Sequence, residues 1–145
     1  DAESPGGYRF IDRAAEHPYM NLTWLRQVPT ATYYGAKFIH ELWRKSVYVS
    51  ENGCAADDKI GDNGEVNDTG RLEYLRGYLA SLQRACAEKI PVKGYFLWSL
   101  LDNFEWSQGF APRFGIVHVD YETRQRTPKL SAKYYAGCIR RNAVL

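Results

Sequence analysis

The chain has 145 residues, of which 45% are hydrophobic and 25% are charged, so it is long enough and apolar enough to bury a core. Its 19 basic and 17 acidic residues leave a formal net charge of +2 without a basic stripe, which argues against nucleic acid as a partner. The longest apolar runs are too short to span a membrane, and no signal peptide is recognisable.

The first elements in chain order are a loop and a helix. Polar clusters and three prolines predict a loop over residues 1–29. Thr30 then provides an N-cap for a helix over residues 30–45. One face of this helix is hydrophobic at four-residue spacing, with Tyr34, Phe38 and Leu42 in line.

A strand over residues 47–53 follows. It begins with four uncharged residues, as a buried strand would, and stops at Glu51-Asn52-Gly53, which favours a turn.

A polar loop over residues 54–68 leads to the clearest helix, predicted over residues 69–88, with Asp68 or Thr69 as its cap. Its hydrophobic face repeats at three and four residues, through Leu72, Leu75, Leu79, Leu82 and Cys86.

The last third of the chain repeats the pattern. Residues 94–106 combine an apolar strand with a polar and aromatic loop, and residues 116–121 favour a short strand or ribbon. Thr127 caps a final helix over residues 128–141, with Pro128 at its first position. The apolar side of this helix holds Leu130, Tyr134 and Cys138.

The order of helix, strand, helix, strand, helix predicts an α/β fold. Both strands are apolar throughout, which favours a parallel sheet covered on both faces. Because α/β proteins place their sites at the carboxyl ends of such strands, the loops after residues 53 and 101 are the places to look for chemistry.

Each strand ends beside a carboxylate. Glu51 stands at the corner of the first strand, and Trp98, Glu105 and Trp106 lie on or after the second. A solvated strand end explains an ordinary Glu, and a core position suits Trp98 equally well. Paired carboxylates flanked by flat aromatic rings are nevertheless typical of a glycosidase site. The residues alone therefore pair Glu51 with Glu105 as two catalytic acids.

Other site classes find little support. The acidic loop Asp57 to Gly64 fails as a calcium loop, because Ile60 and Asn63 occupy positions that require an oxygen ligand and a glycine. No metal site is predicted. The three cysteines form neither a disulfide framework nor a zinc pattern, which favours a reducing, cytoplasmic compartment.

The strand-end motifs resemble a known family. Val47 to Gly53 resembles the nucleophile motif of glycoside hydrolase family 1, in which hydrophobic residues precede Glu-Asn-Gly. The run from Gly94 to Trp106 resembles that family's eighth strand and the loop after it. Shorter segments continue the match in order: Arg113-Phe114-Gly115, Val119-Asp120-Tyr121 and Arg126-Thr127-Pro128-Lys129. The resemblance implies a C-terminal portion of a (β/α)8 TIM barrel, about the last two βα units plus the preceding helix.

The resemblance also implies a role for each site residue. Glu51 would be the nucleophile that forms a covalent glycosyl-enzyme. The implied substrate-binding residues are Trp98, Glu105, Trp106, Phe114 and Trp24. Trp98 would stack under the sugar, and Glu105 and Trp106 would hydrogen-bond its hydroxyls. Phe114 would form a wall of the same pocket, and Trp24 would line the aglycone side.

One residue essential to the family is not found. Its general acid/base comes from an Asn-Glu-Pro motif on the fourth strand, and that tripeptide does not occur in this sequence. A whole barrel takes about 250 residues, so the chain corresponds to part of one. The implied partners are a β-glycoside or oligosaccharide, together with the missing N-terminal part of the barrel or a second copy of the chain.

The resemblance implies a function in carbohydrate metabolism. The chain would form part of a retaining β-glycosidase, foremost a β-glucosidase that hydrolyses terminal β-D-glucosyl residues and needs no cofactor. The alternative is a non-catalytic fragment or sugar-binding module that lacks the acid/base.

Overall fold

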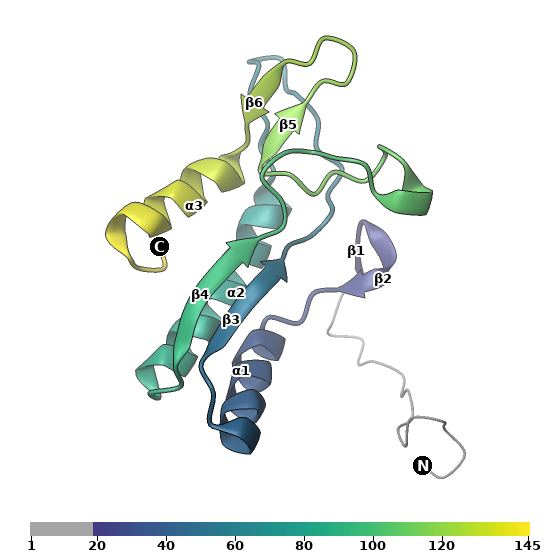
Figure 1. The fold of residues 1–145 in the computed structure, drawn as a ribbon. Coiled ribbons are helices and arrows are strands. Elements are labelled where there is room, and N and C mark those ends of the chain that lie inside the picture. The colour runs from purple at the N-terminus through teal and green to yellow at the C-terminus, as the bar shows by residue number, and fades with distance from the viewer. Residues whose placement is uncertain (1–18) are drawn as a thin grey trace, which may run out of the picture.

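The computed structural model describes residues 19–145, so residues 1–18 of the loop predicted over residues 1–29 lie outside the described range. The elements in chain order are β1 (Tyr19–Met20), β2 (Leu22–Arg26), α1 (Thr30–Trp43), β3 (Val47–Asn52), α2 (Thr69–Ala87), β4 (Val92–Leu97), the 3-10 turn η1 (Trp106–Gln108), β5 (Val117–Val119), β6 (Arg126–Pro128) and α3 (Leu130–Arg141). Figure 1 shows β3 and β4 side by side, with the short β5–β6 ribbon beyond their carboxyl ends.

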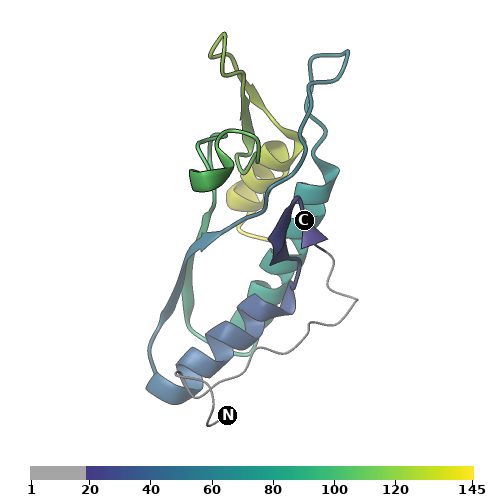
Figure 2. The ribbon, with the colours of Figure 1, turned by 90° about the vertical axis from the view of Figure 1, so that its right-hand side faces the viewer.

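The centre of the fold is a pair of parallel strands, β3 and β4, joined through α2. Figure 2 shows the helices on one side of this pair, whereas the other side is bare. The side chains of Tyr48 and Phe96 on the strands are accordingly 64% and 60% exposed. The parallel pairing agrees with the sequence prediction, but the prediction of a sheet covered on both faces is wrong for this chain.

Two hydrophobic clusters hold the helices against the strands. One joins α1, β3 and the end of α2, and contains Tyr33, Ala36, Val47, Ala85 and Ile90. The other lies where α2 meets the carboxyl ends of the strands, and contains Cys54, Tyr74, Leu75, Tyr78 and Ile116. The strand ends that hold the predicted site therefore rest on a packed base.

The hydrophobic face predicted for α1 is not the buried one. Tyr34, Phe38 and Leu42 are exposed, while Tyr33 and Ala36 are buried. The reason is that α2 and β3 contact α1 on its Tyr33–Ala36 side, and nothing in the described chain covers the other side. On α2, similarly, Cys86 of the predicted hydrophobic face is exposed.

Several predicted boundaries need correction. Residues 19–26, predicted as loop, form the antiparallel pair β1–β2. The N-cap of α1 is Pro29 rather than Thr30. Thr127 and Pro128 belong to β6, which pairs with β5, so α3 starts at Leu130 with Lys129 as its N-cap. The sequence pattern assigns Thr127 and Pro128 to the start of the helix, but in the structure both residues pair with β5 instead.

Asp68 does hold the N-cap position of α2, but its side chain does not cap the helix. Its carboxylate instead hydrogen-bonds Arg71 and the backbone and hydroxyl of Ser131. Across residues 19–145, no helix combines the length and apolar character that a membrane span requires.

Candidate active site

Glu51 is positioned by an irregularity in β3. Val49 pairs with Tyr95 and Asn52 pairs with Leu97, so β3 has one residue more than β4 between these pairs. Such a bulge redirects side chains relative to the regular alternation of a strand. Here it turns the carboxamide of Asn52 toward α2, where it donates to the hydroxyl of Tyr74 at 2.9 Å. Glu51, the residue before it, is exposed and lines a pocket.

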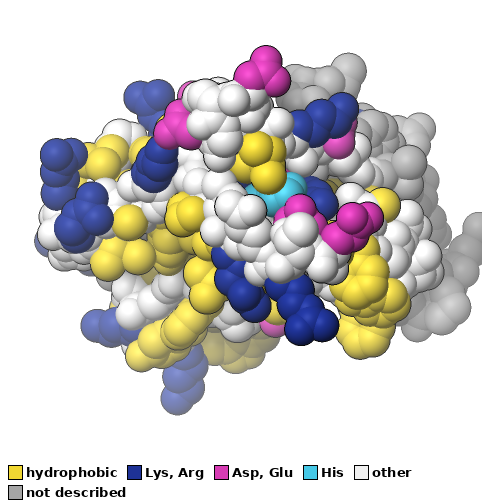
Figure 3. All heavy atoms as spheres, turned by 90° about the horizontal axis from the view of Figure 1, so that it is seen from above, with side chains coloured by type: hydrophobic (Ala, Val, Ile, Leu, Met, Phe, Trp, Pro, Cys, Tyr) yellow, Lys and Arg dark blue, Asp and Glu magenta, His cyan; other side chains and the backbone are white. Residues whose placement is uncertain are grey.

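That pocket is an open hollow of about 470 Å³ at the carboxyl ends of β3 and β4. All six residues singled out from the sequence line it: Glu51, Trp98, Glu105, Trp106, Phe114 and Trp24. The remaining lining residues are Leu25, Asn52, Gly53 and Tyr74. In the view onto this end of the molecule, hydrophobic and acidic side chains lie next to one another on the surface (Figure 3).

The aromatic walls differ in exposure. Phe114 is buried with 5% of its surface exposed, whereas Trp98 is 38% exposed and Trp106 is 81% exposed. Trp106 also has a φ of 43°, a left-handed conformation that is uncommon for a bulky residue and is often found at functional sites. The backbone of its neighbour Glu105 is anchored by a hydrogen bond, in which the Glu105 N–H donates to the carbonyl of Gly109 at 2.7 Å.

A close backbone approach joins the two strand ends. The N–H of Trp98 donates to the carbonyl of Asn52 at 2.9 Å. At Gly53, a Cβ would lie 1.6 Å from the carbonyl oxygen of Trp98, which no side chain could tolerate. Glycine after Glu51-Asn52 is therefore required so that the Glu51 corner and the Trp98 strand end can meet.

A buried ion network lies below the site loops. It contains three carboxylates and three cations: Asp58, Asp68, Asp102, Arg71, Lys129 and Arg113. Arg71 and Lys129 are 0% exposed. Asp102 accepts from Lys129 Nζ and from Arg113 Nη1, both at 2.7 Å, and from two backbone amides. The charges balance, as burial requires.

This network determines the protonation of Asp102 and links the loops. Burial alone would raise the pKa of the Asp102 carboxyl, but Lys129 and Arg113 outweigh burial and hold that pKa below its usual value. Because Lys129 also binds Asp58, it connects the loop after β3 to the loop after β4. The Asp58 carboxylate, part of the acidic loop considered above for calcium, is thus paired with protein cations.

Sequence reasoning missed Asn52, Tyr74 and Lys129 as parts of the site region. Tyr74 is not part of the leucine repeat of α2. The signal that could have identified it is its four-residue spacing from Tyr78, which places both aromatic rings on one face of the helix. For the ion network, the pattern that could have identified it is a charged residue, Arg71, on the apolar face of a helix.

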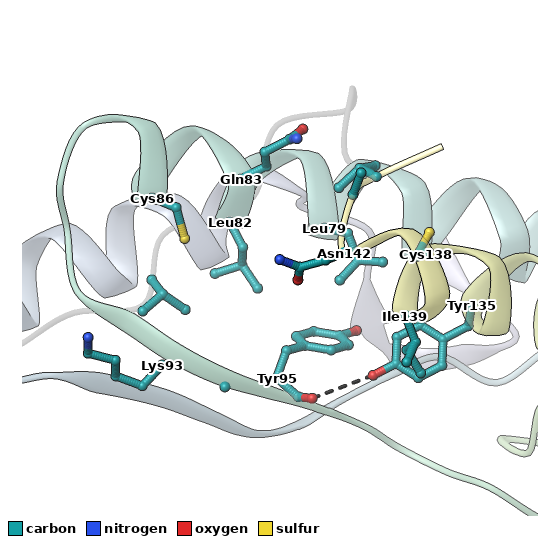
Figure 4. Close-up of a pocket in the computed structure, with 14 residues that line it drawn as sticks. Leu79, Leu82, Gln83, Cys86, Lys93, Tyr95, Tyr135, Cys138, Ile139 and Asn142 are labelled. Carbon is teal, nitrogen blue, oxygen red and sulfur yellow. Dashed lines mark hydrogen bonds between the residues drawn. The ribbon is translucent and has the colours of Figure 1, made fainter.

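A second hollow, of about 410 Å³, lies between α2, β4 and α3 (Figure 4). Its labelled side chains are mostly apolar, including Leu79, Leu82 and Ile139, and the only labelled charge is Lys93. Its described lining contains no carboxylate, whereas the hollow at the strand ends contains two, Glu51 and Glu105.

Comparison with known proteins places this geometry in a family. The model of glycosyl hydrolase family 1 matches residues 7–144. The 1,4-beta-D-glucan glucohydrolase of Thermotoga neapolitana is 41% identical over 99% of the chain, and Beta-glucosidase A of Thermotoga maritima is 39% identical over 99%. The solved family 1 β-glucosidase of Thermotoga maritima in complex with isofagomine lactam superimposes with a TM-score of 0.88 at 39% identity, over 97% of this chain and 32% of that one.

The chain spans about a third of the length of these relatives, 32% of each. Family match, identity and structural similarity nevertheless agree over almost all of its residues. The chain belongs to glycosyl hydrolase family 1.

Proposed function

We propose that this chain is the C-terminal portion of a family 1 barrel and supplies the nucleophile and much of the sugar-binding site of a retaining β-glucosidase. The observation that supports this most directly is the shared pocket. Six residues from β2, β3 and the loop after β4 line one hollow, and two of them are carboxylates. Carboxylates beside flat aromatic rings are what glycoside hydrolysis requires.

The proposed first step uses Glu51. Its carboxylate oxygen attacks the anomeric carbon, a carbon–oxygen ester bond forms, and the glycosidic bond breaks as the leaving oxygen takes up a proton. Water then attacks the same carbon, gives up a proton, and releases the sugar and the Glu51 carboxylate. Glu51 is exposed at the strand end, so its carboxylate is available to a ligand.

The binding residues act on the sugar from the β4 side. Trp98, which is exposed, offers a ring face for stacking, while Glu105 accepts hydrogen bonds from hydroxyls and the Trp106 indole N–H donates one. Phe114 closes the pocket wall, and Trp24 on β2 lines the side toward the leaving group.

We propose that the proton donor comes from polypeptide beyond these 145 residues, which contain no Asn-Glu-Pro tripeptide. The exposed faces of this chain agree with that proposal. Tyr48 and Phe96 on the bare side of the strand pair, and Phe38 and Leu42 on α1, are each more than half exposed. Further strands and helices of a barrel would cover them. A second copy of the chain is the other candidate.

The alternative is a non-catalytic or sugar-binding fragment. It is favoured by the same missing proton donor, because cleavage of a poor leaving group needs an acid placed across the sugar from Glu51. Turnover of cellobiose by the isolated chain would contradict the need for further polypeptide.

The test is covalent labelling with a 2-deoxy-2-fluoro-β-glucosyl inactivator, which retains the glycosyl-enzyme because its hydrolysis is slow. We expect one adduct, mapped by peptide mass spectrometry to Glu51, in the complete protein, and none in Glu51→Gln. The intact mass of the purified protein shows how much polypeptide accompanies the chain. An adduct on Glu105 instead, or labelling of Glu51→Gln, would refute the assignment of the nucleophile.

A further inference from the structure

The geometry points to Tyr74 of α2 as a positioning residue: through Asn52 it holds the β3 bulge and thereby directs Glu51 into the pocket. This inference rests on the proposed role of Glu51 as the nucleophile. Tyr74 bonds Asn52, the residue that follows Glu51, and stacks on Tyr78 of the same helix.

The carboxamide of Asn52 is bound on both of its sides. Its Nδ2 donates to the hydroxyl of Tyr74 at 2.9 Å, and its Oδ1 accepts from the hydroxyl of Tyr95 at 2.9 Å. Its backbone carbonyl accepts from the N–H of Trp98 at 2.9 Å. We call Asn52, Tyr74 and Tyr95 the Asn52 clamp.

The clamp acts where β3 leaves regular pairing. With an extra residue between Val49 and Asn52, the strand ladder alone does not determine which of the neighbouring side chains faces the helices. Fixing the Asn52 carboxamide between Tyr74 and Tyr95 fixes the backbone next to Glu51, which lines the same hollow. Loss of the clamp would free the bulge to adopt other orientations, in which Glu51 points away from the pocket.

Tyr74 is suited to this task because it is rigid. It is 2% exposed and its ring stacks on that of Tyr78, with centroids 4.1 Å apart. The Tyr78 hydroxyl in turn accepts from the N–H of Val28, in the segment between β2 and α1. Burial raises the pKa of Tyr74 and of Tyr95, so both phenols keep their protons at neutral pH. Tyr74 also lines the pocket that contains Glu51.

The experiment compares Tyr74→Phe with a matched control, Tyr135→Phe, in the complete protein. Both variants lose one phenol hydroxyl and keep the ring. The Tyr135 hydroxyl donates only to the backbone carbonyl of Tyr95, at 3.5 Å, and does not contact Asn52. Two quantities are measured: the rate of Glu51 labelling by the fluoro-glucosyl inactivator, and the χ1 rotamer of Glu51 from three-bond NMR couplings to its Cγ.

We expect Tyr74→Phe to slow labelling by about ten- to a hundredfold and to average the Glu51 rotamer, because small misplacement of a reacting group costs rates of this order. Tyr135→Phe should leave both near wild type. If Tyr74→Phe lowers the folded fraction, Tyr95→Phe replaces it, since it removes the other hydrogen bond of the clamp.

The outcomes separate the two proposals. Wild-type labelling rate and rotamer in Tyr74→Phe would overturn the positioning role while leaving the nucleophile assignment intact. If even the wild type takes no label, the nucleophile proposal fails, and the Glu51 rotamer alone then decides. Averaging in Tyr74→Phe but not in Tyr135→Phe supports the clamp, and an unchanged rotamer refutes it.

Discussion

Lys129→Met tests whether the buried ion network holds the site region together. Lys129 is 0% exposed and its ammonium group binds Asp58 and Asp102, which come from the loops after β3 and β4. Methionine has a similar length and no charge, so the change removes the ion pairs with little loss of packing. Three carboxylates would then face two cations, Arg71 and Arg113.

The expected cost follows from what each carboxylate keeps. Breaking a buried ion pair by removing one partner costs about 3–5 kcal/mol. Asp102 retains Arg113 and the N–H groups of Gly115 and Val119, and Asp58 retains Arg71. Because neither carboxylate is left without a donor, we expect the lower end, about 3 kcal/mol, which is a large part of the 5–15 kcal/mol that is typical of a folded domain.

Urea unfolding of the complete protein measures this cost, with the slope of free energy against urea unchanged. The control is Lys133→Met, which removes a lysine whose ion pair with Glu65 is exposed, and it should leave the midpoint nearly where it was. The double change Lys129→Met with Asp58→Asn restores charge balance and should recover part of the loss. A loss below about 1 kcal/mol for Lys129→Met would refute the argument, since that is the range of exposed pairs.

Three further predictions follow from single residues. The pKa of Asp102 in the folded protein lies below its unfolded value of 3.8, so the stability that Asp102 contributes should be present above pH 3.8 and lost as the pH falls through the folded pKa. Urea midpoints measured from pH 6 to pH 2 should therefore drop less steeply in Asp102→Asn than in the wild type. Gly53→Ala should abolish Glu51 labelling and lower the melting temperature, because its Cβ would overlap the Trp98 carbonyl; labelling at the wild-type rate would contradict this. Burial raises the pKa of the Cys54 thiol to about 12, so iodoacetamide at pH 8 should modify exposed Cys86 and spare Cys54 in the native protein, as peptide mass spectrometry would show.

The local sequence pattern was sufficient to predict individual helices and strands whose buried faces it determines. The leucine spacing of residues 69–88 predicted α2, and the uncharged run before Glu51 predicted a strand, because burial against a neighbouring layer imposes these periods. The six residues singled out from the sequence do line one hollow, whereas the roles given to them stay predictions.

What the pattern could not supply depends on contacts far apart in the chain. The exposed side of α1 was predicted as its buried side, because which stripe meets α2 depends on tertiary packing. Lys129 and Asp58 are 71 positions apart, and nothing local identifies them as partners. The bulge at Asn52 is likewise invisible without the register of β4.

The parts of the site that this chain builds internally differ from those that it leaves open. The clamp, the Gly53–Trp98 approach and the ion network all join described residues to one another, so the backbone on either side of Glu51 is held by contacts within this chain. The lining of the hollow is not covered in the same way, since Trp106 is 81% exposed and the hollow is open to water. Hydrogen bonds and charges act weakly on a ligand in water and strongly once water is excluded. In the complete barrel proposed above, further polypeptide would exclude water from around Glu51 and supply the proposed proton donor, and we expect the geometry of the strand ends to stay as it is.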